Sequence, residues 1–160
     1  MYNDPESWYR YYRLKEAGAE VVVVGSGSAE EYTGKAGIPR RPDTTAEQVS
    51  AADCDGIVIP GGYALDHMRR YPAMVKLGKN LFDAGKVMAA ICHAGWMLAP
   101  AEIVKGRTVT SFFAIKARNR KINHPQCPPW LCGDQDSKNA IESGKSGHWN
   151  IRLASNVYHG

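Results

Sequence analysis

The chain has 160 residues with 44% apolar and 22% charged side chains, which predicts one soluble domain with a sizeable core. No apolar run approaches the roughly 20 residues that cross a bilayer, and the N-terminus lacks the basic and apolar regions of a signal peptide, so we expect a cytoplasmic protein without membrane contact. The net charge of +4 is too small to indicate a nucleic-acid partner, and the basic run 116–121 is more typical of a solvated surface strip.

The first predicted element is a helix that begins at Asp4 and ends before Gly18. Asp4 is a suitable N-cap, Pro5 favours the first helical position, and Gly18 favours the residue after the end. The β-branched run Val21 to Val24 follows without polar alternation, as in a parallel strand that is buried on both faces.

The next segment, residues 25–52, contains a turn and a short predicted helix. Gly25-Ser-Gly-Ser28 lacks the third glycine and the following helix of a dinucleotide-binding motif, so we interpret it as a turn and expect no cofactor. Thr44 or Thr45 is a candidate cap for a short helix that ends near Ala52.

Two further buried strands are predicted, each followed by a chemically distinctive loop. Residues Gly56 to Ile59 form the first and end in Pro60-Gly61-Gly62, where backbone can approach a ligand closely. After a helix between Met74 and Ala84, residues Val87 to Ile91 form the second and end in Cys92-His93; residues 107–111 indicate another strand.

Cys92 lies where a predicted strand gives way to a short helical run, as in a nucleophile elbow. The dipole of the following helix would favour the thiolate, and the unpaired N–H after the nucleophile could bind an oxyanion. The alternative is that Cys92 is a small buried hydrophobic residue.

Strands that alternate with helices predict an α/β fold with a mainly parallel sheet. Ligands of such sheets bind outside the carboxyl ends of the strands, where both Gly61-Gly62 and Cys92-His93 fall. Two loops therefore converge on one candidate site.

The character of the chain changes after Lys116. Residues 119–147 are rich in Asn, Pro, Gly, Ser and Asp, which predicts a loop-rich tail over 117–160 beside a domain over 1–116. His124, Cys127 and Cys132 could suggest a metal, but structural zinc sites usually need four ligands in recognisable pairs, so we expect none.

Residues 3–116 resemble the ThiJ/PfpI family of the glutamine-amidotransferase-like superfamily. The resemblance is carried by segments that keep the order and approximate spacing of the family: Tyr11–Gly18, Tyr32–Lys35, Asp55–Gly62, Ala89–Gly95, Val104–Arg107 and Ala114–Lys116. The combination of IPGG with AICHAG is the specific part of this pattern.

The resemblance implies a flavodoxin-like three-layer α/β sandwich and a homodimer or higher homo-oligomer. It also implies that Cys92 is the nucleophile, with His93 as its neighbour and the region of Gly61 and Gly62 as part of an oxyanion hole. Activities in the family include peptide hydrolysis, glyoxal hydration and removal of glycation adducts, so the expected substrate is a small-molecule carbonyl or a peptide.

Three departures from the family pattern bear on activity. The opening strand, which would precede Tyr2 and lie centrally in the sheet, is absent, and its loss would expose two strand edges. Asn3 replaces a glutamate that contacts the cysteine in many members, so it joins Gly61 and Gly62 as a candidate oxyanion or substrate-binding residue, and Asp4 or Glu6 are left as the nearby acids. The family pattern also stops after Lys116.

The role of His93 and the activity itself are open at this stage. Neighbouring side chains on a sharp turn diverge, so a bond between Cys92 and His93 is not assured, and Asp66 is the nearest carboxylate that could orient the histidine. Two hypotheses follow: a cysteine-dependent hydrolase or glyoxalase-like enzyme, or an inactive relative that acts in binding or oligomer formation.

Overall fold

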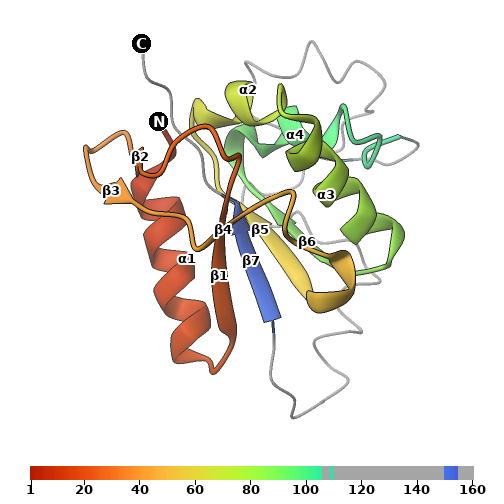
Figure 1. Cartoon of the computed structure of the whole chain (residues 1–160), viewed down its shortest axis with the longest axis horizontal. Helices are drawn as coiled ribbons and strands as arrows, with labels where there is room; N and C mark the ends of the chain where they lie inside the picture. Colours follow the sequence, from red (N-terminus) through yellow and green to blue (C-terminus); the bar gives the residue numbers. More distant parts are fainter. Residues whose placement is uncertain (106–108, 110–149, 155–160) are drawn as a thin grey trace.

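The computed structural model describes residues 1–105, 109 and 150–154, with the side chains of 150, 152 and 153 excepted. Its main sheet has five parallel strands in the order β4-β1-β7-β5-β6. Figure 1 shows helix α1 beside β1 and helix α3 beside β5 and β6. The predicted α/β fold with a parallel sheet is confirmed. The predicted strand at 107–111 and the candidate metal ligands of the tail lie outside the described residues.

Helix α1 spans Asp4–Glu16, and its N-cap is Asn3 rather than the predicted Asp4. The Asn3 side chain accepts a hydrogen bond from the Glu6 N–H at 3.3 Å. Asp4 is buried instead, and its carboxylate accepts a bond from the Ala36 N–H at 2.7 Å. Gly18 follows the helix with φ of 84°, as predicted for a residue past the C-terminus.

The three predicted strands form at the expected places. Strand β1 spans Glu20–Gly25, β5 spans Gly56–Ile59 and β6 spans Val87–Ala90. Strand β5 is buried along its length, but the prediction of a buried strand is wrong for β6, which is half-buried because it lies at the edge of the described sheet. The helix predicted near residues 44–52 is wrong: Thr44–Thr45 form β4, which extends the sheet beside β1, and only a 3₁₀ turn, η1, follows at Ala51–Asp53. The short strands β2 (Tyr32–Thr33) and β3 (Pro39–Arg40) pair separately.

Strand β7, Asn150–Ala154, lies in the centre of the sheet between β1 and β5 (Figure 1). It comes from the part of the chain that was predicted to be a loop-rich tail. Its pairing satisfies backbone groups on both neighbouring strands, so the two edges that an absent opening strand would expose are closed. The sheet that carries the site therefore includes residues from the far end of the sequence.

Two apolar clusters pack on opposite faces of this sheet. Side chains alternate between faces along β5, so Val58 joins a cluster with Val21, Val23, Ile151 and residues of α1. Ile57 and Ile59 face the other way, into a larger cluster that contains residues of α2 (Ala64–Met68), α3 (Pro72–Asp83) and α4 (Gly95–Leu98). Helices on both faces of the sheet give the three layers of the predicted sandwich.

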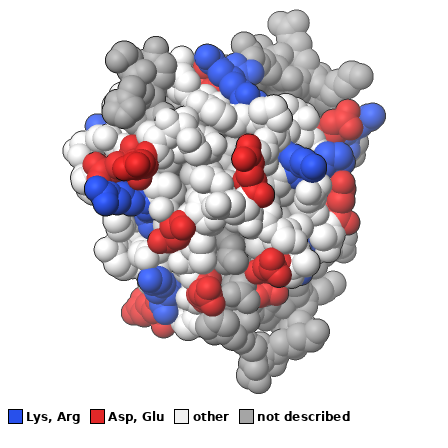
Figure 2. Space-filling view, viewed as in Figure 1, with Lys and Arg blue, Asp and Glu red and all other residues white. Residues whose placement is uncertain are grey.

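The surface carries both signs of charge. On the face drawn in Figure 2, lysine and arginine side chains alternate with aspartate and glutamate. Among the described residues, no helix is both long enough and apolar enough to cross a membrane.

Candidate active site

The two loops expected to converge lie side by side at the carboxyl ends of β5 and β6. The pairing of these strands runs up to Ile59 and Ala90, and the Ile91 N–H donates to the Ile59 carbonyl at 3.3 Å. A Cβ atom added to Gly61 would lie 2.6 Å from the Cβ of Cys92, so the glycine is needed for this close approach.

Cys92 occupies a strained turn between β6 and the 3₁₀ turn η2, Cys92–Ala94. Its φ of 58° is in the left-handed region, which is uncommon for a residue other than glycine and clusters at functional sites. This backbone allows the neighbouring side chains to meet: the Cys92 sulfur lies 3.1 Å from Nδ1 of His93. The divergence expected for adjacent side chains on a sharp turn therefore does not occur.

The backbone N–H groups of His93 and Gly62 lie near the Cys92 sulfur and act to lower its pKa. They come from the two separate loops, and Gly62 can take part because its φ of 103° suits glycine and its backbone lies against Asn3. Because an oxyanion forms next to the attacking sulfur, these two N–H groups are the candidate donors of an oxyanion hole.

The thiol of Cys92 is nevertheless not acidified. Burial and then the negative charge of Glu6 raise its pKa, and they outweigh the two backbone hydrogen bonds, which lower it. Burial also lowers the pKa of His93, although Glu6 acts in the opposite direction. Burial thus moves the pKa of Cys92 up and that of His93 down, and both directions act against a thiolate–imidazolium pair.

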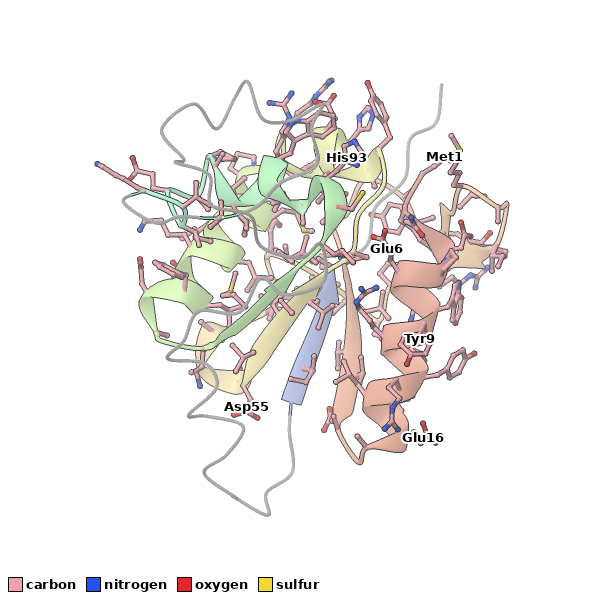
Figure 3. All side chains as sticks on the ribbon, turned by 180° about the vertical axis from the view of Figure 1, so that it is seen from behind. Met1, Glu6, Tyr9, Glu16, Asp55 and His93 are labelled. Atoms are coloured by element: carbon pink, nitrogen blue, oxygen red, sulfur yellow. The ribbon has the colours of Figure 1, made fainter. Side chains whose placement is uncertain are left out.

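Glu6 is the acid nearest the nucleophile, and Figure 3 shows it at the same end of the molecule as His93. Its carboxylate accepts a hydrogen bond from the Gly61 N–H at 2.6 Å and another from the side-chain amide of Asn3 at 3.0 Å. The Gly61 N–H is thus engaged by Glu6, whereas the Gly62 N–H faces the sulfur. Asn3 acts on the site by holding Glu6.

Asp66, considered above as a partner for His93, is bound by arginines. Its carboxylate accepts hydrogen bonds from both Arg69 and Arg70 within and just after α2. Burial alone would raise the pKa of Asp66, but the two guanidinium groups together hold it below its ordinary value. This side chain therefore fixes the turn after α2.

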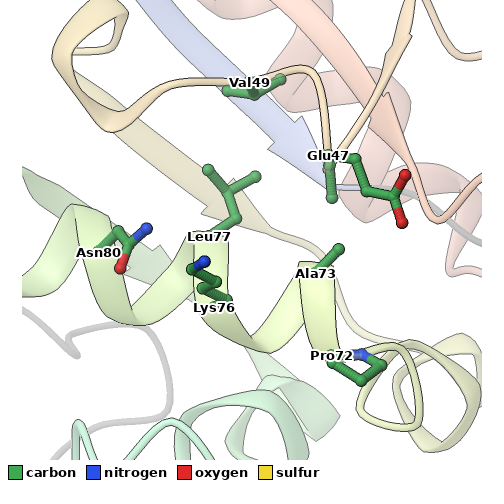
Figure 4. A pocket seen from close by; sticks show the side chains of 8 residues that line it. Glu47, Val49, Pro72, Ala73, Lys76, Leu77 and Asn80 are labelled. Carbon is green, nitrogen blue, oxygen red and sulfur yellow. The ribbon is translucent and has the colours of Figure 1, made fainter.

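Cys54 and a separate pocket show how distinct the Cys92 environment is. Cys54 is buried, and its thiol donates to the Ser50 carbonyl at 3.1 Å, in agreement with the predicted packing role. A pocket of about 400 Å³ lies between α3 and the loop after β4, where Leu77 and Ala73 face Val49 (Figure 4). Its lining contains neither a cysteine nor a histidine.

Within the described part of the chain, no group of three or more metal-ligating side chains is found.

One sequence signal could have identified the position of Glu6. Asn3 and Glu6 have the three-residue spacing of a capping box, in which a polar N-cap bonds the N–H of the third helical residue. This pattern favours Asn3 over Asp4 as the cap and places Glu6 in the first turn, next to the predicted loop cluster.

Comparisons with known proteins identify the family of the chain. The model of the DJ-1/PfpI family matches residues 1–126. A protein of Archaeoglobus fulgidus is 43% identical over 115 residues, which are 72% of this chain and 68% of that protein. The protein named deglycase PfpI of Pyrococcus furiosus is 36% identical over 115 residues, 72% of this chain and 69% of its own.

A solved structure gives the same result for the fold. The two-domain protein of Anabaena variabilis with DJ-1/ThiJ/PfpI-like and ferritin-like domains is 37% identical and has a TM-score of 0.72. The match covers 76% of this chain and 35% of the two-domain protein. The family match, the relatives and the shared fold lead to one conclusion: the chain belongs to the DJ-1/PfpI family.

Proposed function

We propose that this protein is a cysteine-dependent enzyme of the DJ-1/PfpI type that attacks reactive carbonyl compounds through Cys92. The observation that carries the proposal is the contact of 3.1 Å between the Cys92 sulfur and Nδ1 of His93, with backbone N–H groups of His93 and Gly62 directed at the same sulfur. A nucleophile, a base and two oxyanion donors are thereby within reach of one carbonyl carbon.

The short contact between its Nδ1 and the Cys92 sulfur makes His93 the proposed general base. As the sulfur of Cys92 bonds to the aldehyde carbon, its proton passes to Nδ1 of His93 and the carbonyl π electrons move to oxygen. The N–H groups of His93 and Gly62 stabilise the resulting oxyanion, each by about 3 kcal/mol. The oxyanion then takes the proton back from His93, and the product is a thiohemiacetal.

With a 2-oxoaldehyde the reaction is complete without an external oxidant or reductant. The proton on the thiohemiacetal carbon moves to the neighbouring carbonyl carbon through an enediol, which oxidises the first carbon to a thioester and reduces the second to an alcohol. Water then hydrolyses the thioester and releases a 2-hydroxy acid and the thiol. Glu6 lies close enough to take part in these proton transfers.

Glycation adducts and peptides are the related substrates. The name deglycase of the Pyrococcus furiosus relative supports the first, since such adducts release the same 2-oxoaldehydes. Peptide hydrolysis would use the same nucleophile to form a tetrahedral adduct and an acyl-enzyme.

Turnover of methylglyoxal and of a peptide by three proteins tests the proposal. We expect Cys92→Ser to abolish turnover and Cys54→Ser, at the buried cysteine remote from the site, to retain it. Turnover that survives Cys92→Ser would remove this residue from the mechanism. A folded wild-type protein without any turnover would instead favour the alternative, an inactive relative that acts in binding.

We also propose that the protein acts in the cytoplasm as a homo-oligomer, on the basis of the family resemblance. Tyr9 of α1 is available for such contacts, since 69% of its surface is exposed and Figure 3 shows its side chain directed away from the sheet. Light scattering coupled to size-exclusion chromatography tests this; a strict monomer would contradict it.

A further inference from the structure

Three aromatic side chains, here called the aromatic cluster, lie beside the nucleophile: Tyr63, His93 and Trp96. The Trp96 ring lies 5.2 Å from the His93 imidazole and 6.2 Å from the Tyr63 ring, measured between centroids. Tyr63 follows the loop after β5, whereas the other two follow β6. The cluster therefore joins the two loops that supply the nucleophile and the oxyanion donors.

Tyr63 presents its ring to solvent at this point, since 56% of its surface is exposed. A single exposed tyrosine is ordinary, but this one directly follows Gly62, whose N–H faces the Cys92 sulfur. Its edge-on contact with Trp96 orients the ring within the cluster. An apolar surface is thus available next to the position where a carbonyl would react.

The support of the cluster is rigid. The guanidinium of Arg69 lies 5.8 Å from the Trp96 ring centroid and is itself bound by the buried carboxylate of Asp66. On its other side Tyr63 contacts the ring of His67, at 5.6 Å. Aromatic side chains have few rotatable bonds, so little conformational entropy is lost when they contact a ligand.

The position of the cluster favours a particular group on the substrate. A carbonyl oxygen bound by the N–H group of Gly62 would bring the substrate next to the following residue, Tyr63, whose ring contacts Trp96. A planar ring in this substituent can pack on Tyr63 and Trp96 at the spacing of 4.5–7 Å that aromatic pairs prefer. The hydrogen of glyoxal or the methyl group of methylglyoxal buries much less apolar surface there.

We propose that Tyr63 and Trp96 make the site selective for 2-oxoaldehydes that carry an aromatic ring, the aryl glyoxals, over glyoxal and methylglyoxal. This inference rests on the proposed carbonyl chemistry of Cys92. Tyr63 is then a specificity residue that contacts the substrate ring, and its hydroxyl is not required.

The test measures kcat/KM of the full chain for phenylglyoxal and methylglyoxal in the wild type, Tyr63→Ala, Tyr63→Phe and Tyr12→Ala. We expect Tyr63→Ala to lower the value for phenylglyoxal about tenfold, mainly through KM, and to change that for methylglyoxal less than twofold. Tyr63→Phe should keep the wild-type ratio. Tyr12→Ala, at an equally exposed tyrosine on α1, should have no effect. Equal losses for both substrates in Tyr63→Ala would overturn the inference.

A binding measurement separates failure of this inference from failure of the proposed function. If the wild type turns over neither substrate, the proposed chemistry is wrong. Binding can then be measured by tryptophan fluorescence with mandelate and lactate, the 2-hydroxy acids that correspond to phenylglyoxal and methylglyoxal. Tighter binding of mandelate that is lost in Tyr63→Ala would support the aromatic preference by itself. Equal affinities for the two acids would overturn it.

Discussion

Replacement of Gly61 by alanine tests the contact between the two loops of the site. The added Cβ would lie 2.6 Å from the Cβ of Cys92, 2.6 Å from Oε2 of Glu6 and 3.2 Å from the Cys92 sulfur. Contacts below about 3 Å are not tolerated between such atoms, so something must move. The carboxylate of Glu6 can rotate away, but the Cβ of Cys92 is fixed by the backbone of the turn after β6.

The expected loss of stability has two parts. Overpacking against Cys92 costs about 1–3 kcal/mol, and loss of the charge-assisted bond from the Gly61 N–H to Glu6 costs about 1.5–3 kcal/mol. The lower chain entropy of alanine in the unfolded state offsets about 0.4–1 kcal/mol of this. We therefore expect the free energy of unfolding to fall by about 2–5 kcal/mol, and Tm to fall by roughly 5–15 °C.

Urea unfolding followed by tryptophan fluorescence measures this change, with Gly78→Ala as the matched control. Gly78 lies in α3, and a Cβ there would meet no atom within 4 Å, so alanine should stabilise the helix by about 0.5–1 kcal/mol. If Gly61→Ala unfolds at the same urea concentration as the wild type, the two loops do not approach as closely as the structure describes.

Three further predictions concern charge and the central strand. Glu6→Gln keeps an acceptor for the Gly61 N–H but removes the negative charge that, next to burial, raises the pKa of Cys92. We therefore expect the pH midpoint for alkylation of Cys92 by iodoacetamide to fall. An unchanged midpoint would exclude Glu6 as a cause of the raised pKa. The pKa of Asp66 is lower in the folded protein than the value near 3.8 of the unfolded chain. The Asp66 carboxylate therefore stabilises the fold at pH values above 3.8, and this stabilisation is lost as the pH falls through the pKa of the folded state. Asp66→Asn should therefore lower the free energy of unfolding at pH 7 by about 1–3 kcal/mol. The difference in this free energy between pH 7 and pH 3, measured by urea titration, should be smaller in the variant than in the wild type. An equal difference in the two proteins would contradict this. Ile151→Ala should lower the free energy of unfolding by about 2–4 kcal/mol, since this residue of β7 is only 7% exposed. A loss below about 0.5 kcal/mol would show that β7 does not occupy the centre of the sheet.

Local patterns in the sequence were sufficient to predict the strands that carry the site. The continuous apolar runs of β1 and β5 favour burial on both faces, and such burial requires a parallel sheet with helices on both sides. The apolar run of β6 predicted the strand correctly but not its edge position, where its residues are half-buried. The carboxyl ends of two strands of such a sheet lie together, so the proximity of Gly61-Gly62 to Cys92-His93 followed from the order of the elements. The segment 44–52 misled the prediction, because pairing with β1 outweighed a weak capping pattern.

The reactive state of the site could not be predicted in this way. A helix dipole after Cys92 suggested a thiolate, but the ionisation of this thiol depends on its burial and on the carboxylate of Glu6, which comes from a different element. The contact with His93 depends on one backbone angle, the positive φ of Cys92, that residue identity alone does not specify.

The sequence by itself therefore determined the fold class, the positions of Cys92 and of the glycine loop, and the family, since periodicity and short motifs are local properties of the chain. Only the tertiary structure decided that Glu6 holds Gly61, that Asp66 is bound by arginines and that β7 fills the centre of the sheet. The physical reason is that these contacts join residues far apart in the chain or select among several polar partners. Packing, together with the burial and charge around each polar group, determines which partner that group binds.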